Sequence, residues 1–274
     1  MTYYRCRGAV VLLSVLLVAA ACSTDPPPEG SRPEPSVSPS PAESAPENPT
    51  ERCGDPATHA EMVELVADDK TVLAAAHAGT GRVGIVLGHQ YPSDLCDWWP
   101  YLGHLVDSGF NVLAIDFRCY GESACPEGNA SGDLLADVDG AIRYLRRAGA
   151  TRIFYMGASM GGTVAFAAGS KLSRQLAGAI NLSGGGDFTS LTKSTFVDAP
   201  RFAPGVDVPF LSVAARGDLP GNMLRRDFEA IPADDKKLVV LPGSFGHGVS
   251  MLYGNTGEWS RLDRTIRSWL RMRS

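Results

Sequence analysis

The chain has 274 residues, of which 44% are hydrophobic and 20% are charged, a balance typical of a globular protein with a sizeable core. Its formal net charge is -5 at pH 7, and no run of lysine and arginine interrupts that acidic balance. The composition therefore argues against a nucleic-acid-binding protein, because such proteins carry a basic patch or stripe.

The first 22 residues have the composition of an export signal. Arg5 and Arg7 form a short basic region, residues 9–21 are almost wholly apolar, and small residues lead into Cys22. This pattern predicts a secretory signal peptide that is too short to span a membrane. Small residues directly before a cysteine also resemble the bacterial lipobox. That resemblance implies a lipid on Cys22 and a protein held on the extracytoplasmic side of the cell membrane; the alternative is plain secretion.

Residues 23–54 are rich in proline, serine and glutamate and contain almost no large apolar side chain. A segment of this composition cannot bury a core, so we expect a disordered linker that is partly in the polyproline conformation. A spacer that holds a domain away from a membrane agrees with a lipid on Cys22. The globular domain then covers residues 55–274.

Four cysteines lie beyond the export signal: Cys53, Cys96, Cys119 and Cys125. An even number in an exported chain predicts two disulfides, for which three pairings are possible. The short separation favours Cys119 with Cys125, which leaves Cys53 with Cys96. Metal binding by these four would need a ligand spacing that the sequence does not contain.

Strand and helix patterns alternate along the domain. Strands are predicted at residues 61–67, 71–78, 82–89, 111–117, 153–155, 177–182, 209–216 and 237–241, and helices at 98–108, 131–147, 163–172, 222–230 and 256–271. The first two strands form an opening hairpin, and Ser131 is the expected cap of the second helix. This alternation predicts an α/β fold with a doubly wound, mostly parallel sheet of about eight strands.

The strand at residues 153–155 leads into Gly157-Ala158-Ser159-Met160-Gly161, which matches Gly-x-Ser-x-Gly. In this nucleophile elbow, the glycines let strand and helix approach closely while a strained serine stands clear of the sheet. The motif is weak by itself in a chain with 30 glycines, but its place between a strand and a helix makes it specific. Here the chain resembles the α/β-hydrolase family. Residues 116–123 are also similar to the family's Asp-x-Arg-Gly-x-Gly-x-Ser segment, with Cys119 in place of the first glycine.

A serine hydroxyl needs a general base, and the base needs an acid that orients it. In α/β-hydrolases, the acid and the histidine follow the serine in the chain and lie on loops after later strands. Asp218 follows the strand at 209–216 and His247 follows the last strand, so both should share the sheet edge with Ser159. The sequence predicts a triad of these three residues.

Other acids and histidines remain open as alternatives. Asp187 is the runner-up acid, and Asp198 and Asp207 are further candidates. The remaining histidines, His59, His77, His89 and His104, fit structural or solvated roles better than a catalytic one.

The resemblance also implies an oxyanion hole made of two backbone N–H groups. One belongs to Met160, directly after the nucleophile, and the other to Tyr91, in the loop after the third strand. That loop often reads His-Gly-x in the family, whereas here it reads His89-Gln90-Tyr91. Gln90 therefore departs from the expected glycine.

The segment 187–207 lacks helical periodicity and is too short for the cap domain that many α/β-hydrolases carry. The chain is in this respect similar to dienelactone-hydrolase-like and acetylxylan-esterase-like enzymes. The implied function is an extracytoplasmic serine hydrolase that cleaves carboxylic esters of small molecules through an acyl-enzyme, with no metal or organic cofactor. A serine peptidase or thioesterase on the same scaffold and a non-catalytic binding lipoprotein are the alternatives.

Aromatic residues near the predicted site are candidates for a substrate pocket. They are Trp98, Trp99 and Tyr120, together with Tyr91 and the apolar residues of segment 188–202. The same residues fit a hydrophobic core equally well.

Overall fold

The computed structural model describes residues 52–54, 60–126, 132–218, 221–253 and 257–273. The expected export signal, Cys22 as the expected lipidation site and most of the expected linker lie outside these residues, as do His59 and Ser131. None of the described helices combines the length and the hydropathy that a membrane span requires.

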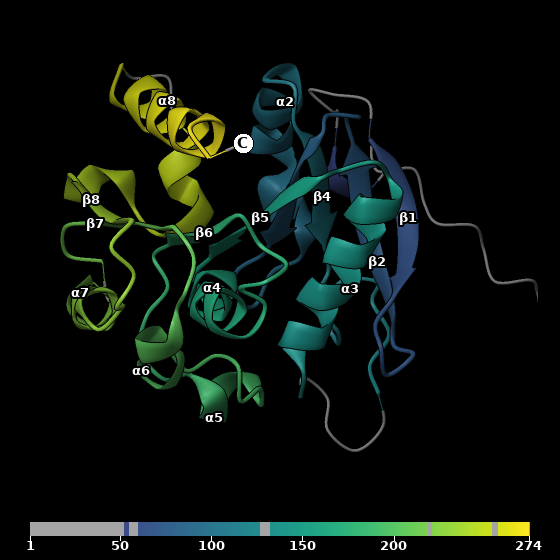
Figure 1. Ribbon diagram of the computed structural model, residues 1–274, viewed down its shortest axis with the longest axis horizontal. Coiled ribbons are helices and arrows are strands. Elements are labelled where there is room, and N and C mark those ends of the chain that lie inside the picture. The colour runs from purple at the N-terminus through teal and green to yellow at the C-terminus, as the bar shows by residue number, and fades with distance from the viewer. Residues whose placement is uncertain (1–51, 55–59, 127–131, 219–220, 254–256, 274) are drawn as a thin grey trace, which may run out of the picture. The chain divides into compact units, whose positions relative to one another are not determined.

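An eight-stranded sheet runs through the domain in the order β1-β2-β4-β3-β5-β6-β7-β8 (Figure 1). The strands are β1 (Glu61–Val66), β2 (Val72–Ala78), β3 (Val83–Gly88), β4 (Asn111–Ile115), β5 (Arg152–Ala158), β6 (Gly178–Leu182), β7 (Phe210–Ala215) and β8 (Lys236–Leu241). All neighbours from β4 through β3 to β8 pair in parallel, whereas β2 is antiparallel to both β1 and β4. The predicted fold class, with its opening hairpin, is confirmed.

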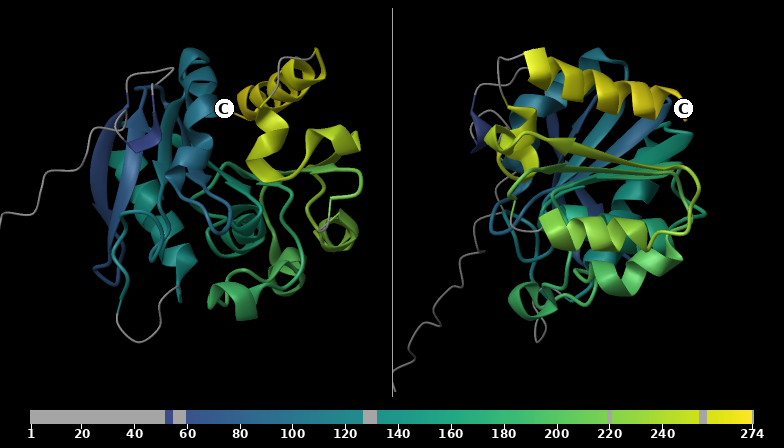
Figure 2. Two further views of the ribbon diagram at one scale, coloured as in Figure 1. Left: turned by 180° about the vertical axis from the view of Figure 1, so that it is seen from behind. Right: turned by 90° about the vertical axis from the view of Figure 1, so that its left-hand side faces the viewer.

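Helices cover both faces of this sheet (Figure 2). They are α2 (Trp99–Asp107), α3 (Leu134–Arg147), α4 (Met160–Lys171), α5 (Thr189–Thr192), α6 (Ala199–Phe202), α7 (Gly221–Glu229) and α8 (Gly257–Arg271), with short 3-10 turns η1 (Leu95–Trp98), η2 (Ala203–Gly205), η3 (Gly243–Phe245) and η4 (Gly248–Leu252). The helices α2 and α8 lie on one face, and α3, α4, α6 and α7 lie on the other.

The core forms because successive side chains of a strand point to opposite faces of the sheet. In β3, Ile85 and Leu87 pack with α2 and α8, while Val86 packs with α3 and α4, and all three are fully buried. A strand covered on both faces reads as a continuous apolar run, which is why the sequence predicts β3 and its parallel neighbours so well.

Two local features differ from the sequence prediction. Helix α3 begins after Asp133, whose side chain accepts the N–H of Ala136 at 2.9 Å and so takes the capping role expected of Ser131. The segment 187–207 contains the helices α5 and α6 and the turn η2. Each of these is about one turn long, too short for a helical period to show in the sequence.

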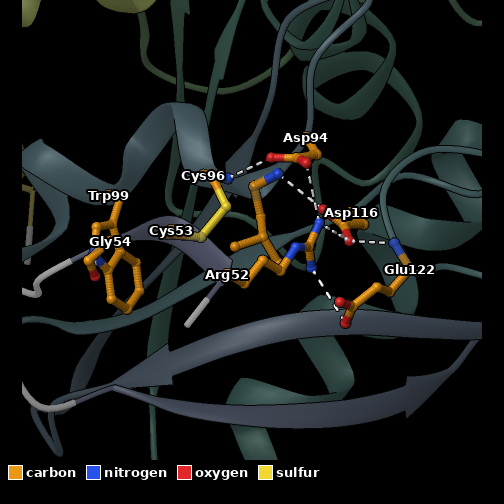
Figure 3. Close-up of a disulfide and its surroundings, with 9 residues drawn as sticks. Arg52, Cys53, Gly54, Asp94, Cys96, Trp99, Asp116 and Glu122 are labelled. Atoms are coloured by element: carbon orange, nitrogen blue, oxygen red, sulfur yellow. Dashed lines mark hydrogen bonds and ion pairs between the residues drawn. A yellow bond between two sulfur atoms is a disulfide. The ribbon is translucent and has the colours of Figure 1, made fainter. Parts of the chain in front are cut away.

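Within the described residues, two disulfides form, Cys53–Cys96 and Cys119–Cys125. The first ties residues 52–54 to the 3-10 turn η1 at the start of α2 (Figure 3). Beside it, the guanidinium of Arg52 lies 2.7 Å from a carboxylate oxygen of Asp116, whose side chain is fully buried. The point where the expected linker meets the domain is thus fixed by a covalent bond and an ion pair.

Candidate active site

Ser159 occupies a sharp turn between β5 and α4. Its backbone has φ +49° and ψ -106°, a conformation that residues other than glycine rarely adopt. This conformation places the serine at the tip of the turn. A Cβ atom added to Gly157 would lie 2.1 Å from the carbonyl oxygen of Gly161, and one added to Gly161 would lie 2.3 Å from that of Gly88. Both glycines of the motif are therefore required by the close approach of backbone segments.

His247 and Asp218 meet at the carboxyl edge of the sheet, on the loops after β8 and β7. The Nδ1 atom of His247 lies 2.7 Å from Oδ1 of Asp218, and the carboxylate side chain is only 3% exposed. With Nδ1 held by the carboxylate, Nε2 is the ring nitrogen left for proton exchange. Ser159, His247 and Asp218 line one cavity of about 470 Å³.

The loop after β3 is shaped by His89. Its Nε2 accepts the N–H of Phe117 at 3.1 Å, so the ring proton sits on Nδ1, which donates to the carbonyl of Gln90 at 2.8 Å. Burial lowers the pKa of His89 to about 4, which keeps the ring neutral. The structural role preferred for this histidine agrees with these contacts.

The elbow is attached to the same loop, because the N–H of Gly161 donates to the carbonyl of His89 at 3.1 Å. Met160 and Tyr91, the two expected oxyanion donors, line a second cavity of about 200 Å³ together with Ser159. Within the part of the chain that the structure describes, neither backbone N–H has a hydrogen-bond acceptor. Two such donors beside a serine can stabilise a developing negative charge.

The two cavities differ in character. The smaller one has an apolar wall that includes Phe188, Leu191 and Val197. The larger one lies on the side of His247 and is also lined by Arg216 and the glycines at 217, 243 and 246. Ser159 and Phe188 line both cavities, so the serine stands at the place where they meet.

Trp98, Trp99 and Tyr120, the expected pocket residues, are not among the residues that line these two cavities. Trp98 is fully buried and Trp99 is 5% exposed, because the start of α2 packs directly onto the sheet. The Tyr120 ring stands edge-on to His89, at 5.2 Å, and to Tyr91, at 6.2 Å between centroids. Its ring therefore packs against two residues of the loop after β3.

Among the lining residues that were not expected from the sequence are Thr163, Ser183 and Arg216. Ser183 and Arg216 directly follow β6 and β7, so their place at the carboxyl ends of parallel strands was the available signal. Thr163 lies on the first turn of α4, where its hydroxyl accepts the N–H of Gly185 at 3.0 Å.

The alternative acids and histidines have other partners. Asp187 accepts the N–H of Thr189 at 2.9 Å at the start of α5, and Asp198 caps α6. His77 contacts the side chain of Asn111 at 2.7 Å, and the His104 ring packs edge-on against Trp259.

Comparisons with known proteins agree with this architecture. A family model described as serine aminopeptidase S33 matches residues 99–190. Epoxide hydrolase A of Mycobacterium tuberculosis is 31% identical over 101 residues, and the matched part covers 36% of this chain but only 31% of that protein.

Among solved structures, an esterase of Pyrococcus furiosus superposes with a TM-score of 0.64 at 17% identity, covering 81% of this chain and 95% of the esterase. An esterase of Thermogutta terrifontis superposes with a TM-score of 0.60 at 21% identity, covering 78% and 99% of the two chains. Likenesses at these identities show a shared fold.

Proposed function

The chain has the α/β-hydrolase fold, and we propose that it is a serine hydrolase that cleaves carboxylic esters. The observation that carries this proposal is the 2.7 Å contact between His247 and Asp218 on the cavity that Ser159 also lines. A serine at a strained elbow, a histidine and a buried carboxylate are the three groups that acyl transfer requires.

In the proposed mechanism, the hydroxyl of Ser159 attacks the ester carbonyl while Nε2 of His247 takes its proton. Asp218 holds the imidazole with its proton on Nδ1 and stabilises the imidazolium that forms. The N–H groups of Met160 and Tyr91 stabilise the negative charge on the carbonyl oxygen. His247 then gives its proton to the departing alcohol, and a water molecule activated by the same histidine releases the acid.

The cavities suggest how an ester would bind. We assign the acyl group to the apolar cavity beside Met160 and Tyr91, because a carbonyl held by these donors directs its acyl chain there. The alcohol would leave through the larger cavity, where His247 can protonate it. Since the acyl cavity is the smaller of the two, we expect esters of short acids to be preferred.

A fluorophosphonate probe tests the nucleophile, because it reacts with an activated serine. Labelling of the wild-type protein and its loss in Ser159→Ala, with the same thermal unfolding midpoint, would support the proposal. A folded wild-type sample that is not labelled would instead favour a binding protein that has this fold without the chemistry.

A panel of p-nitrophenyl esters of increasing acyl length tests the reaction class. We expect kcat/KM to fall once the acyl chain exceeds the smaller cavity. An aminoacyl p-nitroanilide belongs in the panel because the matching family model is described as a serine aminopeptidase, and an epoxide and a thioester complete it. Faster turnover of any of these three would replace the ester assignment.

We also propose that the protein is exported and anchored through a lipid on Cys22. The basic and apolar pattern of residues 1–22 and the proline-rich spacer support this proposal. The two disulfides agree with it, since such bonds persist in oxidising compartments. Radiolabelled palmitate should label the wild-type protein and not Cys22→Ser; an unlabelled wild-type protein would leave plain secretion.

A further inference from the structure

The loop that carries His247 is held by two side chains from the loops that follow other strands. The N–H of Gly248 donates to Oγ of Ser183 at 3.0 Å, and the N–H of Val249 donates to Oε1 of Gln90 at 3.3 Å. Ser183 follows β6 and Gln90 lies two residues after β3. The two residues directly after the histidine are therefore fixed to two different loops of the sheet edge.

The contact between Gln90 and this loop is tight. A Cβ atom added to Gly248 would lie 2.2 Å from Oε1 of Gln90, so the amide oxygen rests against the α-carbon of that glycine. Gly248 also has φ +59°, which turns the chain sharply just after His247. The backbone direction at the histidine thus depends on the amide of Gln90.

Apart from the 2.7 Å contact between its ring and Asp218, few other contacts set the orientation of the histidine. Its side chain is 41% exposed, so packing holds the ring weakly. The backbone N–H of His247 donates to Oγ of Ser250 at 2.9 Å. Ser250 belongs to the adjoining turn, η4, and moves with the histidine. The buried side chain of Val249 anchors the turn in the core, while the directional hydrogen bonds from Gly248 and Val249 set its rotation.

Gln90 also belongs to the loop of the proposed oxyanion donor. Its carbonyl accepts the Nδ1 proton of His89, and the next residue is Tyr91. One residue thus connects the loop of the general base with the loop of an oxyanion donor. A glycine at this position, which is common in the family that the sequence resembles, has no side-chain acceptor for the N–H of Val249.

We propose that Gln90 and Ser183 are positioning residues that hold the backbone of the His247 loop and thereby aim the imidazole at Ser159. The inference rests on the proposed function of Ser159, His247 and Asp218. Neither residue exchanges a proton with the substrate; both act through the histidine.

The test compares Gln90→Met with Gln90→Glu. Methionine has a similar length but lacks the amide acceptor, and it leaves the N–H of Val249 unsatisfied, so we expect kcat for p-nitrophenyl acetate to fall by a factor of about 10 to 100. KM should change less than twofold, which corresponds to a few tenths of a kcal/mol, on the order of 0.4, in free energy. Gln90→Glu keeps an oxygen at the same reach and should recover most of the lost turnover.

Gln175→Met is the matched control. Gln175 is the other glutamine of the chain, and its side chain donates to Asp139 on a surface away from both cavities. This variant loses a side-chain hydrogen bond in the same way and should keep the wild-type kcat. Thermal unfolding midpoints of all variants show whether the fold is retained.

A further comparison uses His247→Ala as the background. If Gln90 acts through the imidazole, Gln90→Met should lower the residual activity of His247→Ala by less than twofold. A change of that size is within the error with which the effects of independent mutations add. Ser183→Ala should behave like Gln90→Met in both backgrounds.

Three results would overturn the proposal: wild-type kcat in Gln90→Met, equal losses in Gln90→Met and Gln90→Glu, or an undiminished effect of Gln90→Met without the histidine. Failure of the underlying function looks different, because the wild-type protein itself would then neither hydrolyse the esters nor react with the fluorophosphonate.

Discussion

The Nδ1 atom of His247 lies 2.7 Å from Oδ1 of Asp218, although 29 positions and the whole of α7 and β8 separate the two residues in the chain. The contact exists because β7 and β8 are parallel neighbours, so the loops at their carboxyl ends emerge side by side. The other carboxylate oxygen of Asp218 is buried and has no hydrogen-bond partner in the described part of the chain. His247 is therefore the main partner that this carboxylate has.

Replacing Asp218 with asparagine tests this relationship. The amide is nearly isosteric but cannot hold the imidazole in the tautomer that leaves Nε2 free, so we expect kcat to fall by about 1,000-fold to 10,000-fold. The thermal unfolding midpoint should change little. Asp187→Asn is the control: it alters an exposed acid at the start of α5 and should leave kcat unchanged. A loss in Asp187→Asn equal to that in Asp218→Asn would mean that the acid is misassigned.

Arg52 should contribute strongly to stability through Asp116. Its side chain is 9% exposed, and its guanidinium faces a fully buried carboxylate at 2.7 Å. Arg52→Met keeps the aliphatic bulk but leaves that charge unpaired, so we expect the free energy of unfolding to fall by about 3 to 5 kcal/mol. Urea denaturation measures the change.

The double variant Arg52→Met/Asp116→Asn separates the buried charge from lost packing. Asparagine removes the negative charge that arginine compensates, so the double variant should be more stable than Arg52→Met alone. A double variant at least as unstable as Arg52→Met would show that the hydrogen bonds of Asp116 to the N–H groups of Leu95 and Glu122 matter more than its charge.

The two disulfides should differ in their contribution to stability. Cys53–Cys96 joins residues 43 positions apart, and Cys119–Cys125 joins residues only 6 apart. The entropy of closing these loops in the unfolded chain predicts losses of about 4 and about 2 kcal/mol when each pair is replaced by serine. Urea denaturation of the two variants gives the comparison. A greater loss for the shorter loop would mean that native contacts around Cys119 outweigh chain entropy.

His89 predicts a pH dependence of stability. Burial lowers its pKa from 6.5 to about 4 in the folded state. Between pH 4 and pH 6.5, the imidazole is therefore protonated in the unfolded chain but neutral in the folded protein. Stability is present above pH 6.5 and is lost as the pH falls toward 4, by up to about 3 kcal/mol.

Asp137 acts against this trend, because burial raises its pKa to about 6 and the folded state then gains a proton on acidification. An NMR titration of the His89 ring separates the two groups. We expect at most about a tenth of this ring to be protonated above pH 5, since its pKa is about 4. A midpoint near the ordinary value for histidine would contradict the buried, neutral ring.

Much of the fold follows from local patterns. The buried runs of β3, β4 and β6 and the apolar stripe of α8 are visible in the sequence because each depends on residues close together in the chain. The elbow at Ser159 is visible as a local motif, although only Gly157 is required by a contact within the strand-turn-helix unit, while Gly161 is required by the carbonyl of Gly88 at the end of β3. Short helices such as α5 and α6 are missed because a single turn has no period.

The sequence by itself determined the fold class and the order of Ser159, Asp218 and His247, and it favoured the disulfide pairing that the structure shares, because these depend on spacing and on where strands end. Only the tertiary structure decided that Trp98 and Trp99 belong to the core and that Gln90 reaches the His247 loop. Those outcomes depend on which elements pack together and on the direction of single side chains. Residues 90 and 249 meet across an edge of the sheet, and no local pattern records a contact between residues so far apart in the chain.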